Sequence, residues 1–262
     1  MPATDLDLLI AAAREAGELA TRYSGPSTKR WDKSDGAGPV TEADLAVDAL
    51  LRKRLTGARP GYGWLSEETP DGVERLSRRR TFIVDPIDGT RSFIEGSPIW
   101  AHSLAVAEEG RVIAAVVFLP LKHKLYSAAS GAGAFLNGAA IRATAQDRLA
   151  GASVLAAKPT CDPVNWRGRE VPRINRHHRP SLAYRLSLVA EGRFDAMLTL
   201  RPSWEWDIAA GALILTEAGA QTTDRTGAPL RFNNPHPQVN GVVAAGASLH
   251  HALSSRLAQW PG

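Results

Sequence analysis

The stretch Asp85-Pro-Ile-Asp-Gly-Thr90 contains the residues of this chain that are best suited to chemistry. The apolar run Phe82-Ile83-Val84 predicts a short buried strand that delivers Asp85 and Asp88 into a turn. A proline without a backbone donor and Gly89, which tolerates a left-handed backbone, predict that neither strand nor helix continues unchanged there. A helix that begins directly after the turn would leave free N–H groups beside the carboxylates. This arrangement suits a divalent cation and a phosphate together.

Three acidic residues elsewhere in the chain can converge on this turn, namely Asp44, Glu67 and Asp207. Each also has an ordinary explanation, because Asp44 ends a capping-box pattern, Asp207 stands at an expected helix start, and Glu67 is typical of a surface. Together with Asp85 and Asp88, however, they would supply hard oxygen ligands for two or three Mg²⁺ ions, with Asp85 as a bridge. Two such ions can clamp a phosphoryl group and lower the pKa of a bound water.

The residues after Asp88 would complete a phosphate site. Backbone N–H groups of Gly89, Thr90 and Arg91 can hold phosphate oxygens from the other side. The Thr90 hydroxyl, if it is hydrogen-bonded to Asp44, can orient an attacking water. These residues therefore predict metal-assisted hydrolysis of a phosphate ester.

The bulk composition is that of an ordinary globular protein. The chain has 262 residues, 44% of them hydrophobic and 22% charged, with a formal net charge of +4. This charge is too small to predict nucleic-acid binding, and we interpret the basic segment 173–179 as a solvated loop, with a phosphate-facing patch as the alternative. No apolar run approaches the roughly 18 residues of a membrane span. The single cysteine, Cys161, excludes an intramolecular disulfide and fits a reducing compartment, so we expect a cytoplasmic protein.

The pattern of elements changes along the chain, which predicts a mixed α+β and α/β fold in one compact unit. Residues 1–147 would form an α+β region with most metal ligands, and residues 148–262 an α/β region with Asp207 and the substrate-side residues. The expected helices cover 4–23, 41–55, 181–191 and 207–218, the expected strands cover 101–107, 111–119, 124–128, 153–157 and 194–200, and a final strand and helix lie within 241–258.

Several motifs resemble a known family. Glu67-Glu68, Asp85-Pro-Ile-Asp-Gly-Thr90 and Trp206-Asp207-Ile-Ala-Ala-Gly211 are similar, in order and spacing, to signature elements of the inositol-monophosphatase-like family of Mg²⁺-dependent, Li⁺-sensitive phosphatases. Val40-Thr-Glu-Ala-Asp44 adds a fourth element, and the resemblance extends over essentially the whole chain. It implies the layered αβαβα sandwich of the inositol monophosphatase and fructose-1,6-bisphosphatase type, and a homodimer.

The resemblance also implies which residues bind metal. Glu67, Asp85 and the Ile87 carbonyl would bind the first Mg²⁺. Asp85, Asp88 and Asp207 would bind the second.

The catalytic residues implied by the resemblance are Thr90, with Asp44 or Glu67, which would position and activate the nucleophilic water. Lys33 corresponds to a lysine in a flexible loop of inositol monophosphatases, and its role here stays open.

Three further stretches resemble bacterial 3′(2′),5′-bisphosphate nucleotidases: Gly89–Ile94, Tyr184–Gly192 and Pro202–Gly211. They place Arg91 after the threonine and Arg185 where those enzymes have lysine. A second cation is what a substrate with two phosphates requires.

Position 200 separates this chain from typical inositol monophosphatases. Those enzymes carry an acidic residue seven positions before the Trp-Asp aspartate, where it grips ring hydroxyls, whereas this chain has Leu200. A leucine would leave the hydroxyls of a polyol unpaired, which argues against inositol selectivity. Trp204 can stack on an adenine, although core packing or a surface anchor is the favoured interpretation.

We therefore expect a Mg²⁺-dependent phosphomonoesterase that removes the 3′-phosphate of adenosine 3′,5′-bisphosphate by attack of a metal-activated water. The alternatives at the same site are inositol phosphates, histidinol phosphate or a broad set of sugar phosphates. A regulatory protein that contacts RNA through 173–179 belongs to another class and would not need the complete ligand set. The expected substrate contacts are Asp88, Gly89, Thr90, Arg91, Arg185 and Asp207.

Overall fold

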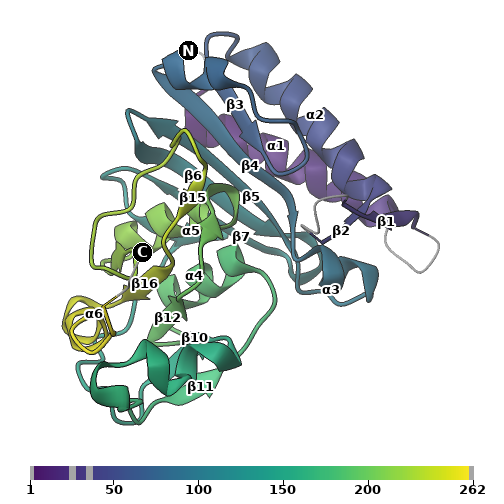
Figure 1. Ribbon diagram of the computed structural model, residues 1–262. Helices are drawn as coiled ribbons and strands as arrows, with labels where there is room; N and C mark the ends of the chain where they lie inside the picture. Colours follow the sequence, from purple (N-terminus) through teal and green to yellow (C-terminus); the bar gives the residue numbers. More distant parts are fainter. Residues whose placement is uncertain (1–2, 24–27, 34–37, 260–262) are drawn as a thin grey trace.

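The computed structural model describes residues 3–23, 28–33 and 38–259 as two stacked sheets with helices on every face (Figure 1). The seven-stranded sheet has the order β3-β4-β5-β6-β7-β8-β9, and the five-stranded sheet has the order β11-β10-β12-β16-β14. Helices α1 and α2 cover one face of the seven-stranded sheet, α4 and α5 lie between the two sheets, and α6 covers the outer face of the five-stranded sheet. The layers therefore follow the order αβαβα, which confirms the fold expected from the sequence.

The first half of the chain contains a two-stranded hairpin and the whole seven-stranded sheet. Its elements are α1 (Asp5–Ala20), β1 (Arg30–Asp32), β2 (Pro39–Thr41), α2 (Glu42–Ala58), β3 (Gly63–Ser66), β4 (Arg80–Asp88), α3 (Thr90–Ile94), β5 (Ala101–Glu108), β6 (Arg111–Leu119), β7 (Lys124–Ala129), β8 (Ala134–Leu136) and β9 (Ala139–Ala140). Short 3₁₀ helices cover Thr21–Tyr23, Val73–Ser77 and Pro120–Lys122.

The second half contains the five-stranded sheet and a two-stranded sheet of β13 and β15. Its elements are β10 (Ser153–Ala156), β11 (Asn175–His177), α4 (Leu182–Ala190), β12 (Ala196–Thr199), β13 (Ser203–Trp204), α5 (Glu205–Glu217), β14 (Gln221–Thr223), β15 (Gln238–Val239), β16 (Val242–Ala245) and α6 (Ala247–Ser254). Short 3₁₀ helices cover Lys158–Cys161, Pro163–Asn165 and Arg167–Arg169.

Strand β4 shows how the sequence divides the core into layers. Phe82 and Val84 pack on the α1 and α2 side, whereas Ile83 between them packs on the α4 and α5 side. This alternation follows from the two-residue period of a strand, and it explains why both faces of a central strand are apolar.

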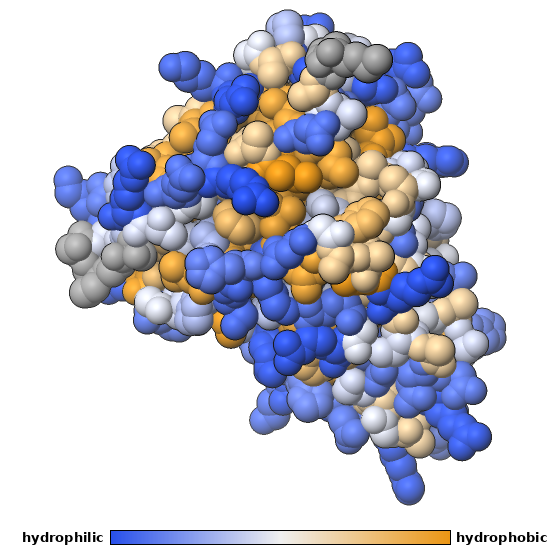
Figure 2. Space-filling view, turned by 180° about the vertical axis from the view of Figure 1, so that it is seen from behind, coloured by the Kyte–Doolittle hydropathy of each residue, from blue (hydrophilic) through white to orange (hydrophobic). Residues whose placement is uncertain are grey.

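Seen from the opposite side, hydrophobic residues gather in the upper half of the molecule, bordered by hydrophilic ones (Figure 2).

Two boundaries differ from the sequence-based expectation. Strand β4 does not stop at the predicted turn but continues to Asp88, because the pairing with β5 shifts register between Asp85 and Asp88 and needs no N–H from Pro86. Helix α5 begins at Glu205 rather than Asp207, so Asp207 lies in the first turn and is not the cap.

The basic segment 173–179 also differs from the expectation of a loop. Residues Asn175–His177 form the edge strand β11, which pairs in parallel with β10, although all three residues are exposed. Exposed basic side chains suit an edge strand, because their charge discourages pairing with another sheet.

Helices α1 and α2 begin with the same capping box. Thr4 accepts a hydrogen bond from the Asp7 N–H at 3.1 Å, and Thr41 accepts one from the Asp44 N–H at 3.4 Å. The reciprocal bonds also form, since Asp7 and Asp44 each accept from the N–H of their threonine. Thr4 is exposed, whereas Thr41 is fully buried.

This pair provides a matched test of capping in two environments. We expect Thr4→Ala to lower the free energy of unfolding by about 0.5 kcal/mol and Thr41→Ala by about 2 kcal/mol, because only Thr41→Ala leaves a buried carboxylate with a lost donor. Urea unfolding of both variants measures the difference. Equal losses would contradict the assigned role of burial.

Candidate metal and phosphate site

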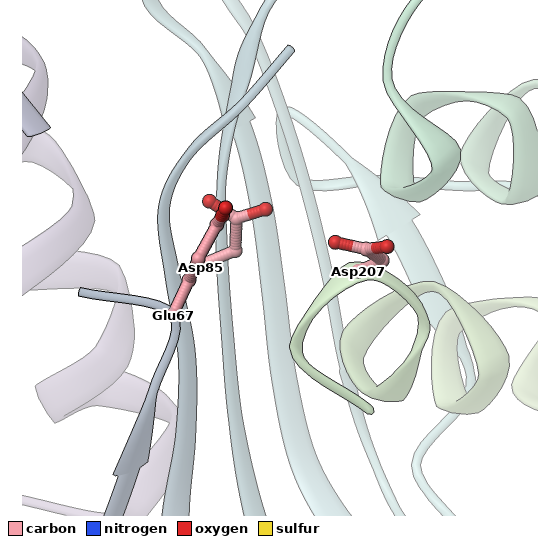
Figure 3. A group of neighbouring side chains, drawn as sticks. All are labelled: Glu67, Asp85 and Asp207. Carbon is pink, nitrogen blue, oxygen red and sulfur yellow. The ribbon is translucent and has the colours of Figure 1, made fainter. Parts of the chain in front are cut away.

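Three carboxylates meet where the seven-stranded sheet faces α5. One oxygen from each of Glu67, Asp85 and Asp207 lies within 4.8 Å of the other two (Figure 3). Glu67 follows β3, Asp85 lies in the neighbouring parallel strand β4, and Asp207 projects toward both from the first turn of α5. This convergence agrees with the expectation from the sequence, although Glu67 and Asp207 lie far apart along the chain.

Backbone and side-chain hydrogen bonds hold the three elements together. The Glu67 N–H donates to the Val84 carbonyl oxygen at 3.2 Å, which ties the end of β3 to β4. The Ser103 hydroxyl donates to the Trp206 carbonyl oxygen at 2.8 Å, which ties the start of α5 to β5. Bonds to the backbone therefore fix the elements that carry the carboxylates.

The electrostatics of the cluster fit a cation. Burial, together with the charges of Glu67, Asp88 and Asp207, raises the pKa of Asp85 well above its usual range. Burial and the charges of Asp88 and Glu67 likewise raise the pKa of Asp207. Asp85 Oδ1 is buried and has no hydrogen-bond partner among the described residues. A divalent ion with oxygen ligands would satisfy this atom and offset the repulsion.

Asp88 lies beside this cluster but is held differently. Its Oδ2 accepts hydrogen bonds from the Ser181 hydroxyl at 2.6 Å and from the Ala183 N–H at 2.7 Å. Burial raises the pKa of Asp88 to about 6, although these two donors and the charge of Arg185 oppose the shift. Sequence reasoning missed Ser181 and Ala183; the available signal was a serine directly before an apolar helical run.

Thr90 and Asp44 also meet as expected. The Thr90 hydroxyl lies 3.2 Å from Asp44 Oδ1 and 3.1 Å from the Ile87 carbonyl oxygen. The other oxygen of Asp44 accepts from the N–H and the hydroxyl of Thr41, at 2.8 and 2.5 Å. Burial raises the pKa of Asp44 to about 6 against these hydrogen bonds. Asp44 is therefore both a capping residue and a partner of Thr90.

Lys33 reaches the cluster from the hairpin of β1 and β2. Its Nζ lies 2.9 Å from an oxygen of Glu67 and 2.9 Å from an oxygen of Glu68. The charge of Glu67 and hydrogen bonds to both glutamates raise the pKa of Lys33, although burial alone would lower it. Residues 34–37 of the glycine-rich loop lie outside the described residues.

The expected substrate-side residues are spread around the cluster. Gly89 has a φ of 102°, so it requires the left-handed backbone predicted for it, and Arg91 is exposed on α3. Arg185 is only 9% exposed, and its Nη2 lies 2.8 Å from His178 Nε2. Leu200 packs into the core beneath α6, 7% exposed.

Arg201, which the sequence analysis missed, follows directly and is exposed. Its charge opposes the upward shift of the Asp207 pKa and helps burial to lower the pKa of Arg185. The side of the site near α4 therefore carries positive charge from two arginines.

Comparison with known proteins agrees with this geometry. Residues 2–259 match the model of the inositol monophosphatase family. The chain belongs to this family. It is 35% identical to an inositol-1-monophosphatase of Rhizobium meliloti over 238 residues, which cover 85% of this chain and 86% of that protein. It is 32% identical to the Nus factor SuhB of Escherichia coli over 232 residues, 85% of each chain.

The solved structures give the same result. The extragenic suppressor protein suhB from Bartonella henselae superposes with a TM-score of 0.80 and 28% identity, over 95% of this chain and 96% of that one. An IMPase from Thermotoga maritima also has a TM-score of 0.80 and 28% identity, over 95% of each chain. The protein is thus a phosphatase of the inositol monophosphatase family, which uses Mg²⁺, and its acidic cluster is suited to hold metal. No helix among the described residues is long and apolar enough to cross a membrane.

The repulsion in the cluster predicts how Asp85→Asn behaves. At neutral pH we expect the metal-free variant to be more stable than the metal-free parent, because the parent ionises a buried carboxylate whose folded-state pKa is raised. This advantage should shrink as the pH falls toward about 4, because the same carboxyl then also becomes protonated in the unfolded chain. Saturating Mg²⁺, about 100 times the Kd, should stabilise the parent by about 2.7 kcal/mol and the variant much less.

Thermal unfolding with and without MgCl₂ at several pH values measures these effects. A variant that gains as much stability from Mg²⁺ as the parent would contradict the assignment of Asp85 as a ligand.

Proposed function

We propose that this phosphatase removes the 3′-phosphate of adenosine 3′,5′-bisphosphate. The observation that carries the proposal is the positive charge beside Asp88, where Arg185 acts on the carboxylate from a buried position. A substrate with a second phosphate gains from such a charge, whereas a neutral polyol does not.

The metal ligands follow from the acidic cluster. Glu67, Asp85 and the Ile87 carbonyl would hold one Mg²⁺, and Asp85, Asp88 and Asp207 a second. When bound, the ions supply Lewis-acid stabilisation of the phosphoryl group and a more acidic water. We propose that two or three Mg²⁺ ions occupy the site during turnover.

The chain's own contribution to the water attack lies in Thr90 and Asp44. When the Thr90 hydroxyl donates to Asp44, its lone pairs are free to accept a hydrogen bond from a water and so orient it. The raised pKa of Asp44, about 6, brings this carboxylate closer to the value that suits a general base near neutral pH. Glu67 is the alternative base, but one of its oxygens already accepts a hydrogen bond from Lys33 Nζ at 2.9 Å.

Leu200 disfavours a polyol as the substrate. The Leu200 side chain is buried and apolar, so it offers no acceptor for a ring hydroxyl. The neighbouring Arg201 instead adds positive charge near Asp207.

Inositol phosphates are the second candidate substrates, because several relatives of this length are named inositol-1-monophosphatases. Histidinol phosphate and other sugar phosphates would use the same metal site. We also propose a homodimer, by family resemblance, and a cytoplasmic location, which the single Cys161 supports.

A substrate panel tests the proposal. With Mg²⁺ present, we expect kcat/KM for adenosine 3′,5′-bisphosphate to exceed that for inositol 1-phosphate and histidinol phosphate at least tenfold. Only the bisphosphate has a second phosphate that can interact with the positive charge near Arg185 and Arg201. Asp85→Asn should abolish turnover of every substrate and serves as the background control. Equal rates on the bisphosphate and on simple monoesters would reject the nucleotidase assignment.

Lithium tests the second metal site. Millimolar Li⁺ should inhibit in competition with Mg²⁺, because a singly charged ion would occupy the position formed by Asp88 and Asp207 without supplying the same charge. Initial rates over a grid of both cations measure the competition. An enzyme indifferent to Li⁺ would contradict this geometry of the second site.

A further inference from the structure

A cavity of about 460 Å³ lies beside α4, and its wall is rich in positive charge. Four basic side chains line it, together with Tyr184. The basic residues are Lys122, Lys124, Arg179 and Arg193.

Only part of this charge is neutralised within the protein. The buried carboxylate of Glu191 lies 2.8 Å from Lys124 Nζ and 3.6 Å from Arg193 Nε, so it pairs with two of the four cations. Among the described residues, no carboxylate lies within 4.0 Å of Lys122 or Arg179. The cavity therefore has two cations available for an anion.

The cavity adjoins the residues that hold Asp88. The N–H of Tyr184 donates at 3.0 Å to the Ser181 hydroxyl, which donates to Asp88. On the other wall, Ile99 approaches Gly89 closely: a Cβ added to this glycine would lie 3.4 Å from the Ile99 carbonyl oxygen. One residue of each wall, Tyr184 and Ile99, therefore lies close to the segment that would hold the phosphate under attack.

Arg185 connects the two places without lining the cavity. Its Nε donates to the Arg179 carbonyl oxygen, and its Nη2 bonds His178, so these donors are used within the protein. Arg179 itself extends over the Phe194 ring, with its Cζ 5.6 Å from the ring centroid. The buried arginine holds the loop, and the loop presents the guanidinium of Arg179 to the cavity.

We propose that this cavity binds a second phosphate group of the substrate, with Arg179 and Lys122 as direct contacts and Arg185 as a positioning residue. A dianionic phosphate matches the two unpaired cations, and a guanidinium can grip it through two parallel hydrogen bonds. This assignment rests on the proposed function, since it places the 5′-phosphate while the 3′-phosphate reacts.

The test compares two substrates that share the reacting ester. Adenosine 3′,5′-bisphosphate has the second phosphate, and adenosine 3′-monophosphate lacks it. In Arg179→Ala and Lys122→Ala, the ratio of kcat/KM for the bisphosphate over the monophosphate should fall at least tenfold, mainly through KM. Arg148→Ala, which removes an arginine with 85% of its side chain exposed, is the matched control and should leave the ratio unchanged.

The positioning role of Arg185 has its own readout. Arg185→Ala should lower the ratio as Arg179→Ala does, and the double variant should be no worse than either, because both changes remove the same contact. Additive losses would instead mean that Arg185 binds the phosphate independently, and would overturn its positioning role.

The outcomes separate this proposal from the proposed function. A parent enzyme that turns over both nucleotides equally well would reject the bisphosphate preference. A parent with a strong preference that Arg179→Ala and Lys122→Ala leave intact would overturn the cavity assignment and keep the nucleotidase.

Discussion

The structure depends on one unfavourable interaction, the repulsion among buried and half-buried carboxylates where the seven-stranded sheet faces α5. Oxygens of Glu67, Asp85 and Asp207 approach within 4.8 Å, and burial makes the ionisation of Asp85 and Asp207 costly. An arrangement of this kind persists only if the surrounding packing holds it. The five alternating layers supply that packing, since β4 is covered on both faces and α5 lies between two sheets. A bound cation would turn the repulsion into attraction, which is why the same residues can serve stability and chemistry.

The acids around this cluster divide into two kinds. Both oxygens of Asp44 accept hydrogen bonds, from Thr41 and Thr90, and Oδ2 of Asp88 accepts from Ser181 and Ala183, so hydrogen bonds set their positions. Asp85, in contrast, keeps a buried oxygen without a partner among the described residues. The first kind can orient a water or a phosphate precisely because it is already held. Asp85 is left for a metal, and Asp88 would join it as a ligand of the second ion while its Oδ2 stays hydrogen-bonded.

The reacting site and the substrate side come from different parts of the fold. Most of the acids lie on β4 and α2 or directly after β3, in the seven-stranded sheet and its outer helix. Lys33 reaches these acids from the first half of the chain, whereas the arginines on the substrate side, Arg179, Arg185 and Arg201, come from α4 and from loops next to strands of the five-stranded sheet. Loops of this kind can change without disturbing the scaffold. The chemistry can therefore be predicted from a sequence motif, whereas the substrate depends on residues outside that motif.

The sequence by itself determined the elements and the chemistry. The capping boxes at Thr4 and Thr41, the apolar periods of the helices and the alternation in β4 are local signals, and local backbone physics is enough to interpret them. The sequence also predicted that Asp44, Glu67, Asp85 and Asp207 belong together, because their types and motifs match a metal site. Only the tertiary structure decided which carboxylate oxygens accept hydrogen bonds and which have no partner. It also decided that Arg185 is buried beneath the loop of Arg179 and that Leu200 faces the core. Those properties depend on which residues distant in the chain become neighbours, and neither period nor spacing contains that information.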